Sequence, residues 1–228
     1  MSGKLVWDKI GEHFFETGVD HGVLYRLDQS GAYKNAYPWN GLTAVNENPT
    51  GAEGNAQYAD NIKYLNLISN EEWEGTIEAF TYPDEFAECD GSKSLLPGVE
   101  IGQQPRKMFG FSYRTLIGND VEGQDYGYKI HVVYGANASP SQKNYQTVND
   151  SPEAIALSWD VKTTPVAVKD AKPTATLVFD STKLTEAQMK LVEDTLYGVD
   201  ADPEQQIEAA DGWLPLPDEW VEMFEDLA

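Results

Sequence analysis

The stretch Phe109–Tyr134, FGFSYRTLIGNDVEGQDYGYKIHVVY, decides the fold class of this chain. On each side of its centre, aromatic and β-branched residues alternate with small or polar ones, which is the period of a strand with one buried face. The central segment Gly118–Asp125 is rich in Gly, Asn and Asp, which favour reversal of the chain. The pattern therefore predicts a long antiparallel hairpin formed by strands 109–117 and 126–134.

Shorter segments repeat this alternation elsewhere. In Trp73–Thr81 and Ile155–Val161 the apolar residues fall on one face and the polar residues on the other. Val19–Leu27 and Thr174–Phe179 are expected to be further strands. A chain with this many alternating strands is predicted to be mainly β, an antiparallel sandwich or barrel.

The C-terminal quarter carries the helical signals. Thr185 and Gln188 have the spacing of a capping box, which predicts a helix over Glu186–Tyr197 that packs on the sheet. A shorter helix is expected to begin after Pro217. We expect residues 1–180 to form the β core, and residues 181–228 to add the packing helix and an acidic C-terminal segment to the same domain.

The charge balance excludes several classes of partner. The 228 residues include 38 acidic and 16 basic ones, for a formal net charge of −22. Such a surface repels phosphate, which argues against specific binding of nucleic acid or of anionic lipid. From residue 191 onward there are 12 acidic residues and no Lys or Arg. This end is either a solvated face or a surface that meets a basic partner.

No membrane span, catalytic group, metal site or cofactor site is predicted. The chain has no apolar run of 18 residues, and we expect it to fold in a cytoplasm. The acidic neighbours of Cys89, the one cysteine, are expected to raise its thiol pKa, which is the wrong direction for a nucleophile. The turn at 119–125 lacks the ligand spacing of a calcium loop. The three histidines do not have metal-ligand spacing: His13, His21 and His131.

Long segments rich in Gly, Asn and Pro separate the predicted strands. Asn46–Tyr58, Pro83–Lys107 and Ala136–Gln146 are expected to be loops. Loops of this length in a compact domain are functional or disordered. Two tryptophans beside such segments, Trp39 and Trp213, belong either to the core, to a subunit contact or to a sugar-binding surface.

Several blocks, in order along most of the chain, are similar to one protein family. They are Gly18–Tyr25 and Trp39–Thr43; Tyr58–Asn61 and Gly75–Phe86; Gly110–Tyr113, Gly118–Asp120 and Tyr126–His131; Asn149–Glu153 and Ser158–Trp159; Phe179–Thr182, Leu196–Gly198 and Leu214–Glu219. Together they resemble the major tail proteins, or tail tube proteins, of long non-contractile-tailed bacteriophages of Gram-positive hosts.

The resemblance implies a structural role in a virion. Tail tube proteins form hexameric rings that stack into a tube, and the tube conducts DNA without binding it specifically. The implied partners are further copies of the chain, a tape-measure protein, a tail terminator and distal tail or tail-tip proteins. The resemblance implies no catalytic residue and no cofactor, and a β-sandwich or barrel with a flanking helix. It places the protein in the tail tube, and in the host cytoplasm during assembly.

Two sets of residues follow as candidates. Strands 109–117 and 126–134 are expected to help form the pore wall, with these candidates: Phe109, Phe111, Tyr113, Tyr126, Tyr128 and Ile130. Segments 46–58 and 83–107 are expected to contact the next ring, with these candidates: Asn46, Pro49, Glu53, Asp84, Asp90 and Lys93.

Two other functions remain open at this point. One is a tube-capping tail protein, a terminator or distal tail protein, which does not polymerise alone. The other is a carbohydrate-binding β-sandwich or a glycoside hydrolase, since a pair among 38 carboxylates is always available.

Overall fold

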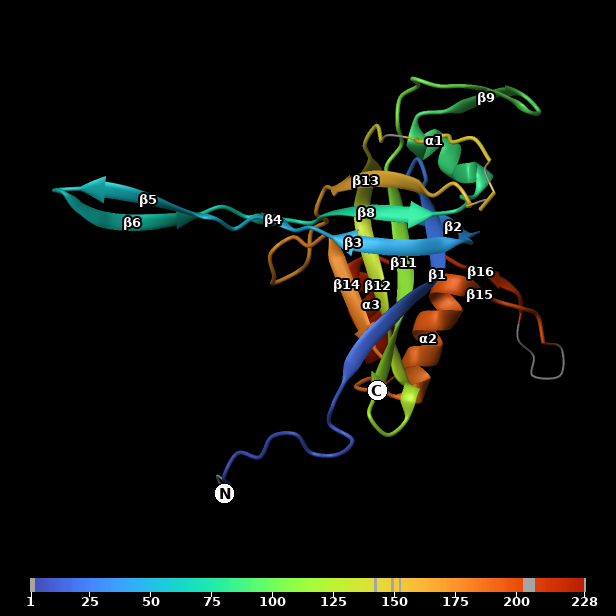
Figure 1. The fold of residues 1–228 in the computed structure, drawn as a ribbon. Coiled ribbons are helices and arrows are strands. Elements are labelled where there is room, and N and C mark those ends of the chain that lie inside the picture. The colour runs from blue at the N-terminus through green and yellow to red at the C-terminus, as the bar shows by residue number, and fades with distance from the viewer. Residues whose placement is uncertain (1–2, 142, 149, 152, 203–207, 228) are drawn as a thin grey trace.

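The computed structural model describes residues 3–227 except 142, 149, 152 and 203–207 (Figure 1). Its main sheet has eight strands in the order β2-β1-β11-β12-β13-β8-β3, and β14 pairs with β12 beside that path. Every pair is antiparallel, so the prediction of a mainly β, antiparallel protein is confirmed. The strands of this sheet are β1 (Phe15–Leu27), β2 (Tyr33–Trp39), β3 (Leu42–Glu47), β8 (Glu74–Ala79), β11 (Phe109–Asn119), β12 (Gly123–Ala138), β13 (Leu157–Thr163) and β14 (Thr176–Asp180).

The predicted central hairpin is present. β11 and β12 pair from Phe109↔Ala136 to Asn119↔Gly123, and the turn between them lies where the Gly, Asn and Asp residues stand. The amide oxygen of Asn119 accepts hydrogen bonds from the backbone N–H groups of Val121 and Glu122, at 3.0 and 2.6 Å. The side chain therefore closes the turn that the sequence signals.

The long strand β12 belongs to both layers of the sheet, because its two halves pair with different strands. Residues 129–133 of β12 pair with β14, whereas residues 136–138 pair with β13. Figure 1 shows β13, β8 and β3 running across β11 and β12. An aromatic cluster fills the space between the layers, and its ring centroids are 4.5 to 5.5 Å apart: Trp39, Phe86, Phe109, Phe111 and Trp159. Trp39 is therefore a core residue.

Two helices cover the opposite face of the β1-β11-β12-β14 part of the sheet. They are α2 (Glu186–Tyr197) and α3 (Pro217–Glu225), as predicted. Thr185 accepts from the backbone N–H of Gln188, and the Gln188 side chain accepts from the N–H of Thr185, which is the expected capping box. A second core lies beneath both helices and includes Ile130, Tyr134, Phe179, Leu196 and Trp220.

The predicted loop over Asn46–Tyr58 is wrong, because the structure has strands there. β4 (Thr50–Gly51) pairs with β7 (Glu71–Glu72), and β5 (Gly54–Ala59) pairs with β6 (Ile62–Ile68). We call residues 50–72 the hairpin arm. Both faces of the arm are in solvent, so its sequence shows no alternation between buried and exposed residues.

The predicted loop over Pro83–Lys107 also contains regular structure. It holds the short helices η1 (Asp84–Phe86) and α1 (Ala87–Asp90), followed by a small hairpin of β9 (Lys93–Leu96) and β10 (Val99–Ile101). β15 (Gly198–Val199) and β16 (Ala210–Asp211) form one more small pair. No described helix is long and apolar enough to cross a bilayer.

Candidate assembly surfaces

The hairpin arm exposes a cluster of large apolar side chains. Figure 1 shows it reaching away from the body, beyond the edge of the two layers. Six large apolar side chains on it are between 40 and 73% exposed: Tyr58, Ile62, Tyr64, Leu65, Leu67 and Ile68. A two-stranded hairpin of this kind is marginally stable alone in water, and exposed apolar strands associate. Exposed apolar surface of this kind makes the arm a candidate contact surface for another chain.

Both faces of the arm are apolar. A register shift at Tyr64 interrupts the alternation in β6, so Ile62, Leu65 and Leu67 share one face of the arm. Ile68 lies on the other face, together with Tyr58 of β5. Apart from Tyr58, which pairs with Lys63, the opposing β5 residues are small or polar: Ala56 pairs with Asn66, and Gln57 with Leu65. A partner on one face alone leaves the apolar side chains of the other face in solvent. Burial of all of these side chains therefore needs contacts on both faces of the arm.

A second exposed apolar element is the N-terminal segment, residues 3–14. Its root is fixed to the β11–β12 turn by the carboxylate of Asp120, which accepts from the N–H groups of Gly11 and His13 at 3.0 and 3.3 Å. The Nδ1 atom of His13 lies 3.2 Å from the same carboxylate. The rings of Phe14 and Tyr126 add an aromatic contact, with centroids 5.0 Å apart. These contacts set the direction in which residues 3–10 leave the body.

The β1-β11-β12-β14 part of the sheet is open along both edges in the described residues. β2 pairs with β1 only from Gly22 onward, so residues 15–20 of β1 have β11 as their one strand partner. β14 pairs with β12 alone. Because adjacent strands alternate in direction, the free edges of β1 and β14 run in opposite directions. These edges are ready-made templates for pairing with another chain.

One face of this part of the sheet carries a polar cluster. Lys129 forms an ion pair with Glu16, and the Nε2 atom of His131 lies 3.0 Å from the hydroxyl of Thr115. The imidazole of His131 stacks on the ring of Tyr113, with centroids 4.7 Å apart and planes 3° apart. Burial lowers the pKa of His131, so the ring is neutral at pH 7. His131 is therefore packed against the hairpin through its contact with Tyr113.

The structure places most of the pore-wall candidates inside the protein. Phe109, Phe111, Tyr113 and Ile130 are at most 4% exposed and belong to the two cores. Tyr128 lies beneath α2, and its hydroxyl donates to Glu193 at 2.8 Å. Tyr126 is exposed beside the β11–β12 turn.

The side chains that reach solvent from these strands are different ones. Thr115 shares one face of β11 with Phe111 and Tyr113, and Lys129 lies opposite it in β12. Glu16 of β1 joins them through its ion pair with Lys129. Sequence reasoning missed them because it followed the apolar residues; the polar Thr115 in line with those apolar residues was the signal that could have found them.

The inter-ring candidates differ in where they lie and in whether another subunit could reach them. Pro49 and Glu53 are exposed at the base of the hairpin arm, and Asp84 and Lys93 are exposed in the 83–107 segment. Asn46 lies in β3, where its amide donates to Glu78 at 3.2 Å. Asp90 is buried and unavailable for contact with another subunit.

The carboxylate of Asp90 fastens the 83–107 segment to the body. It lies 3.4 Å from Arg106 and 2.8 Å from Lys143, and its side chain is 7% exposed. Asp90→Asn leaves two partly buried cations without their counter-charge, so we expect a loss of about 1–3 kcal/mol in the free energy of unfolding. Urea unfolding measures the loss. The exposed Asp84→Asn is the matched control, and an equal effect of both substitutions would contradict this role for Asp90.

The thiol of Cys89 is not a nucleophile in this structure. Burial raises its pKa to about 12. The predicted direction is confirmed, but burial is the largest cause, and the acidic neighbours contribute less. Within the described residues, no group of three or more His, Cys, Asp or Glu side chains is placed to hold a metal ion.

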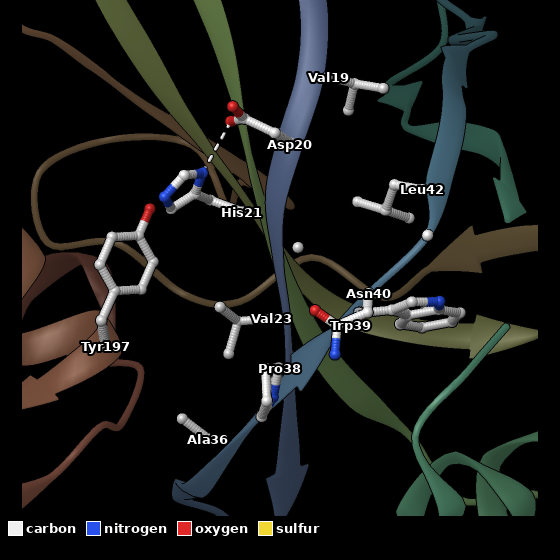
Figure 2. Close-up of a pocket in the computed structure, with 12 residues that line it drawn as sticks. Val19, Asp20, His21, Val23, Ala36, Pro38, Trp39, Asn40, Leu42 and Tyr197 are labelled. Atoms are coloured by element: carbon white, nitrogen blue, oxygen red, sulfur yellow. Dashed lines mark ion pairs between the residues drawn. The ribbon is translucent and has the colours of Figure 1, made fainter.

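A cavity of about 530 Å³ lies between β1 and the β2–β3 turn (Figure 2). Its wall is mainly apolar, formed by Val19, Val23, Pro38 and Leu42, among others. At one side Nδ1 of His21 lies 3.0 Å from Asp20, and Figure 2 shows the Tyr197 hydroxyl pointing toward the His21 ring.

The chemistry of the cavity suits an apolar guest. The guanidinium of Arg114 donates twice to Asp20, at 2.8 Å each, and lowers the pKa of that carboxyl. The described lining contains no Ser, Thr, Cys or Lys that His21 could activate. An apolar side chain fits this cavity better than a phosphate or a metal does.

Neither a scan against protein-family models nor a search of curated proteins finds a match for this chain.

Proposed function

We propose that this chain is a structural subunit that assembles into rings, and that the rings stack into a tube of the phage tail type. The hairpin arm carries the proposal, because its apolar side chains on both faces need other subunits to cover them. The arm contains the predicted inter-ring candidate Glu53, and Pro49 lies directly before it. In the proposed tube, the arm bridges from one ring to the next.

The free sheet edges support ring closure. Pairing the β1 edge of one copy with the β14 edge of the next is a head-to-tail contact, which closes into a ring when its rotation closes. Copies related by rotation about the tube axis keep the same strand direction along that axis. The new pair is then antiparallel, like every pair within the sheet. The resemblance sets the expected number of copies at six.

The polar face of this continuous sheet becomes the lining of the tube. Strands 109–117 and 126–134 then form the pore wall, as expected from the sequence, through Glu16, Thr115 and Lys129 rather than through the buried aromatic residues. A net charge of −22 per subunit discourages binding of passing DNA. In this proposal the protein is not an enzyme and needs no cofactor. Its partners are its own copies, the tape-measure protein and the proteins at the two ends of the tail, and it resides in the virion.

Electron microscopy of the concentrated protein tests the proposal. Negatively stained samples are expected to contain hollow tubes or six-fold rings, and sedimentation velocity is expected to show large species that grow with concentration. A protein that stays monomeric, both alone and with purified tail-tip complex, overturns the proposed tube. Binding on a glycan array by that monomer would instead favour a carbohydrate-binding β-sandwich.

A further inference from the structure

The N-terminal segment combines exposed apolar side chains with two lysines, on a protein that is acidic overall. Leu5, Val6, Trp7 and Ile10 are 71, 62, 71 and 87% exposed, respectively. Lys4 and Lys9 flank this run, and Asp8 is the one acidic residue among residues 3–10. Lys9 forms an exposed ion pair with Glu12 at 3.2 Å, which is weak because both side chains are more than half exposed. The segment therefore suits a partner surface that is both apolar and acidic.

The exposed side of α3 is a surface of that kind. Val221 and Leu227 are 55 and 48% exposed. Glu222, Glu225 and Asp226 flank them and are also exposed. The last turn of α3 contains no basic residue, although cations are favoured at the C-terminal end of a helix. An apolar peptide with two lysines laid along this side buries apolar area and brings positive charge to the acidic turn.

The proposed ring contact brings these two elements together. The N-terminal segment leaves the sheet at Phe15, the first residue of β1, at the end where the β11–β12 turn lies (Figure 1). β14 ends at Asp180, close to this same end, because Asp180 pairs with Lys129 of β12. The end of α3 packs behind β14, with the ring centroids of Phe224 and Phe179 6.1 Å apart. Pairing of the β1 edge with the β14 edge of the next copy therefore places the N-terminal segment beside that copy's α3.

We propose that the N-terminal segment of one copy docks on the exposed side of α3 in the next copy of the ring. Its apolar run covers Val221 and Leu227, and Lys4 and Lys9 face the acids of the last turn. The docking partner is a second copy of this chain. This inference rests on the proposed function, since it uses the β1–β14 contact. It also gives the acidic C-terminal end a basic partner.

Charge reversal in the full chain tests the docking. Lys4→Glu with Lys9→Glu is expected to raise the concentration needed for assembly by about tenfold, because two attractive contacts become repulsive. Adding Glu222→Lys and Glu225→Lys to the same chain is expected to restore assembly to within about threefold of the original. Lys34→Glu with Lys172→Glu is the control, since it makes the same change in net charge at exposed positions outside the N-terminal segment and α3. Sedimentation velocity over a concentration series gives each value.

Crosslinking between different chains provides a position-specific readout. A chain with Leu5→Cys is mixed with a chain with Val221→Cys, and a bismaleimide is added after assembly. A crosslinked dimer of the two chains is expected, whereas Leu5→Cys mixed with Thr164→Cys is expected to give none.

The two proposals fail in different ways. If the unaltered protein assembles, but the Lys4 and Lys9 reversals leave assembly unchanged and no crosslink forms, the docking is wrong and the tube stands. If the unaltered protein forms no oligomer under any condition, both are wrong.

Discussion

Replacing residues 52–70 by a two-residue Asn-Gly turn is expected to give a folded chain that no longer forms tubes. The replacement joins Gly51 to Glu71, which already face each other in the β4–β7 pair, and Asn-Gly is the favoured two-residue hairpin turn. It removes all six exposed apolar side chains of the arm. We expect the concentration needed for stacking to rise on the order of a hundredfold or more, because each of these side chains contributes apolar burial.

The shortened chain should keep its fold, because β5 and β6 pair only with each other. Near-ultraviolet circular dichroism and the thermal midpoint of the monomer check this point. Single substitutions then separate the two faces: Ile68→Ser on one side and Leu67→Ser on the other are each expected to weaken stacking, whereas the polar Asn55→Ser is not. Tubes of normal appearance from the shortened chain would show that the arm is not the contact between rings.

Trp159→Ala is expected to be the most destabilising single substitution in the core. The Trp159 side chain is fully buried between the two layers of the sheet, and its ring lies 5.4 to 5.5 Å from those of Trp39, Tyr82 and Phe86. The cavity left by the indole costs about 3–5 kcal/mol, a large share of the total stability of a typical domain. Urea unfolding should show a lower midpoint with an unchanged slope.

Two matched variants isolate the cause. The indole N–H of Trp159 is buried without a hydrogen-bond partner among the described residues. Trp159→Phe therefore breaks no hydrogen bond and leaves no polar group without its partner. We expect Trp159→Phe to cost less than about 1.5 kcal/mol. Tyr145→Ala removes an exposed ring and is expected to be neutral. A loss as large for Trp159→Phe as for Trp159→Ala would mean that shape at this position, rather than volume, limits stability.

Local patterns determined several elements of this protein without reference to the rest of the chain. The β11–β12 hairpin was predictable because its period-two alternation and its Asn and Gly turn act over a few neighbouring residues. The start of α2 was predictable for the same reason, since Thr185 and Gln188 cap the helix from within its first turn. The net charge likewise follows from composition, and it argues against the phosphate-binding classes.

The tertiary structure alone decided where the candidate surfaces lie. The hairpin arm shows no buried-exposed period, because neither face of it touches the body. Asp90 is buried because Arg106 and Lys143, 16 and 53 residues away in the sequence, meet at its carboxylate. The alternation in β11 defined two faces, but only the packing of α2 and α3 showed which face stays open. The free edges of β1 and β14 could be identified only from the strand order. Pairing between distant strands depends on the whole sheet and not on the sequence within any one strand.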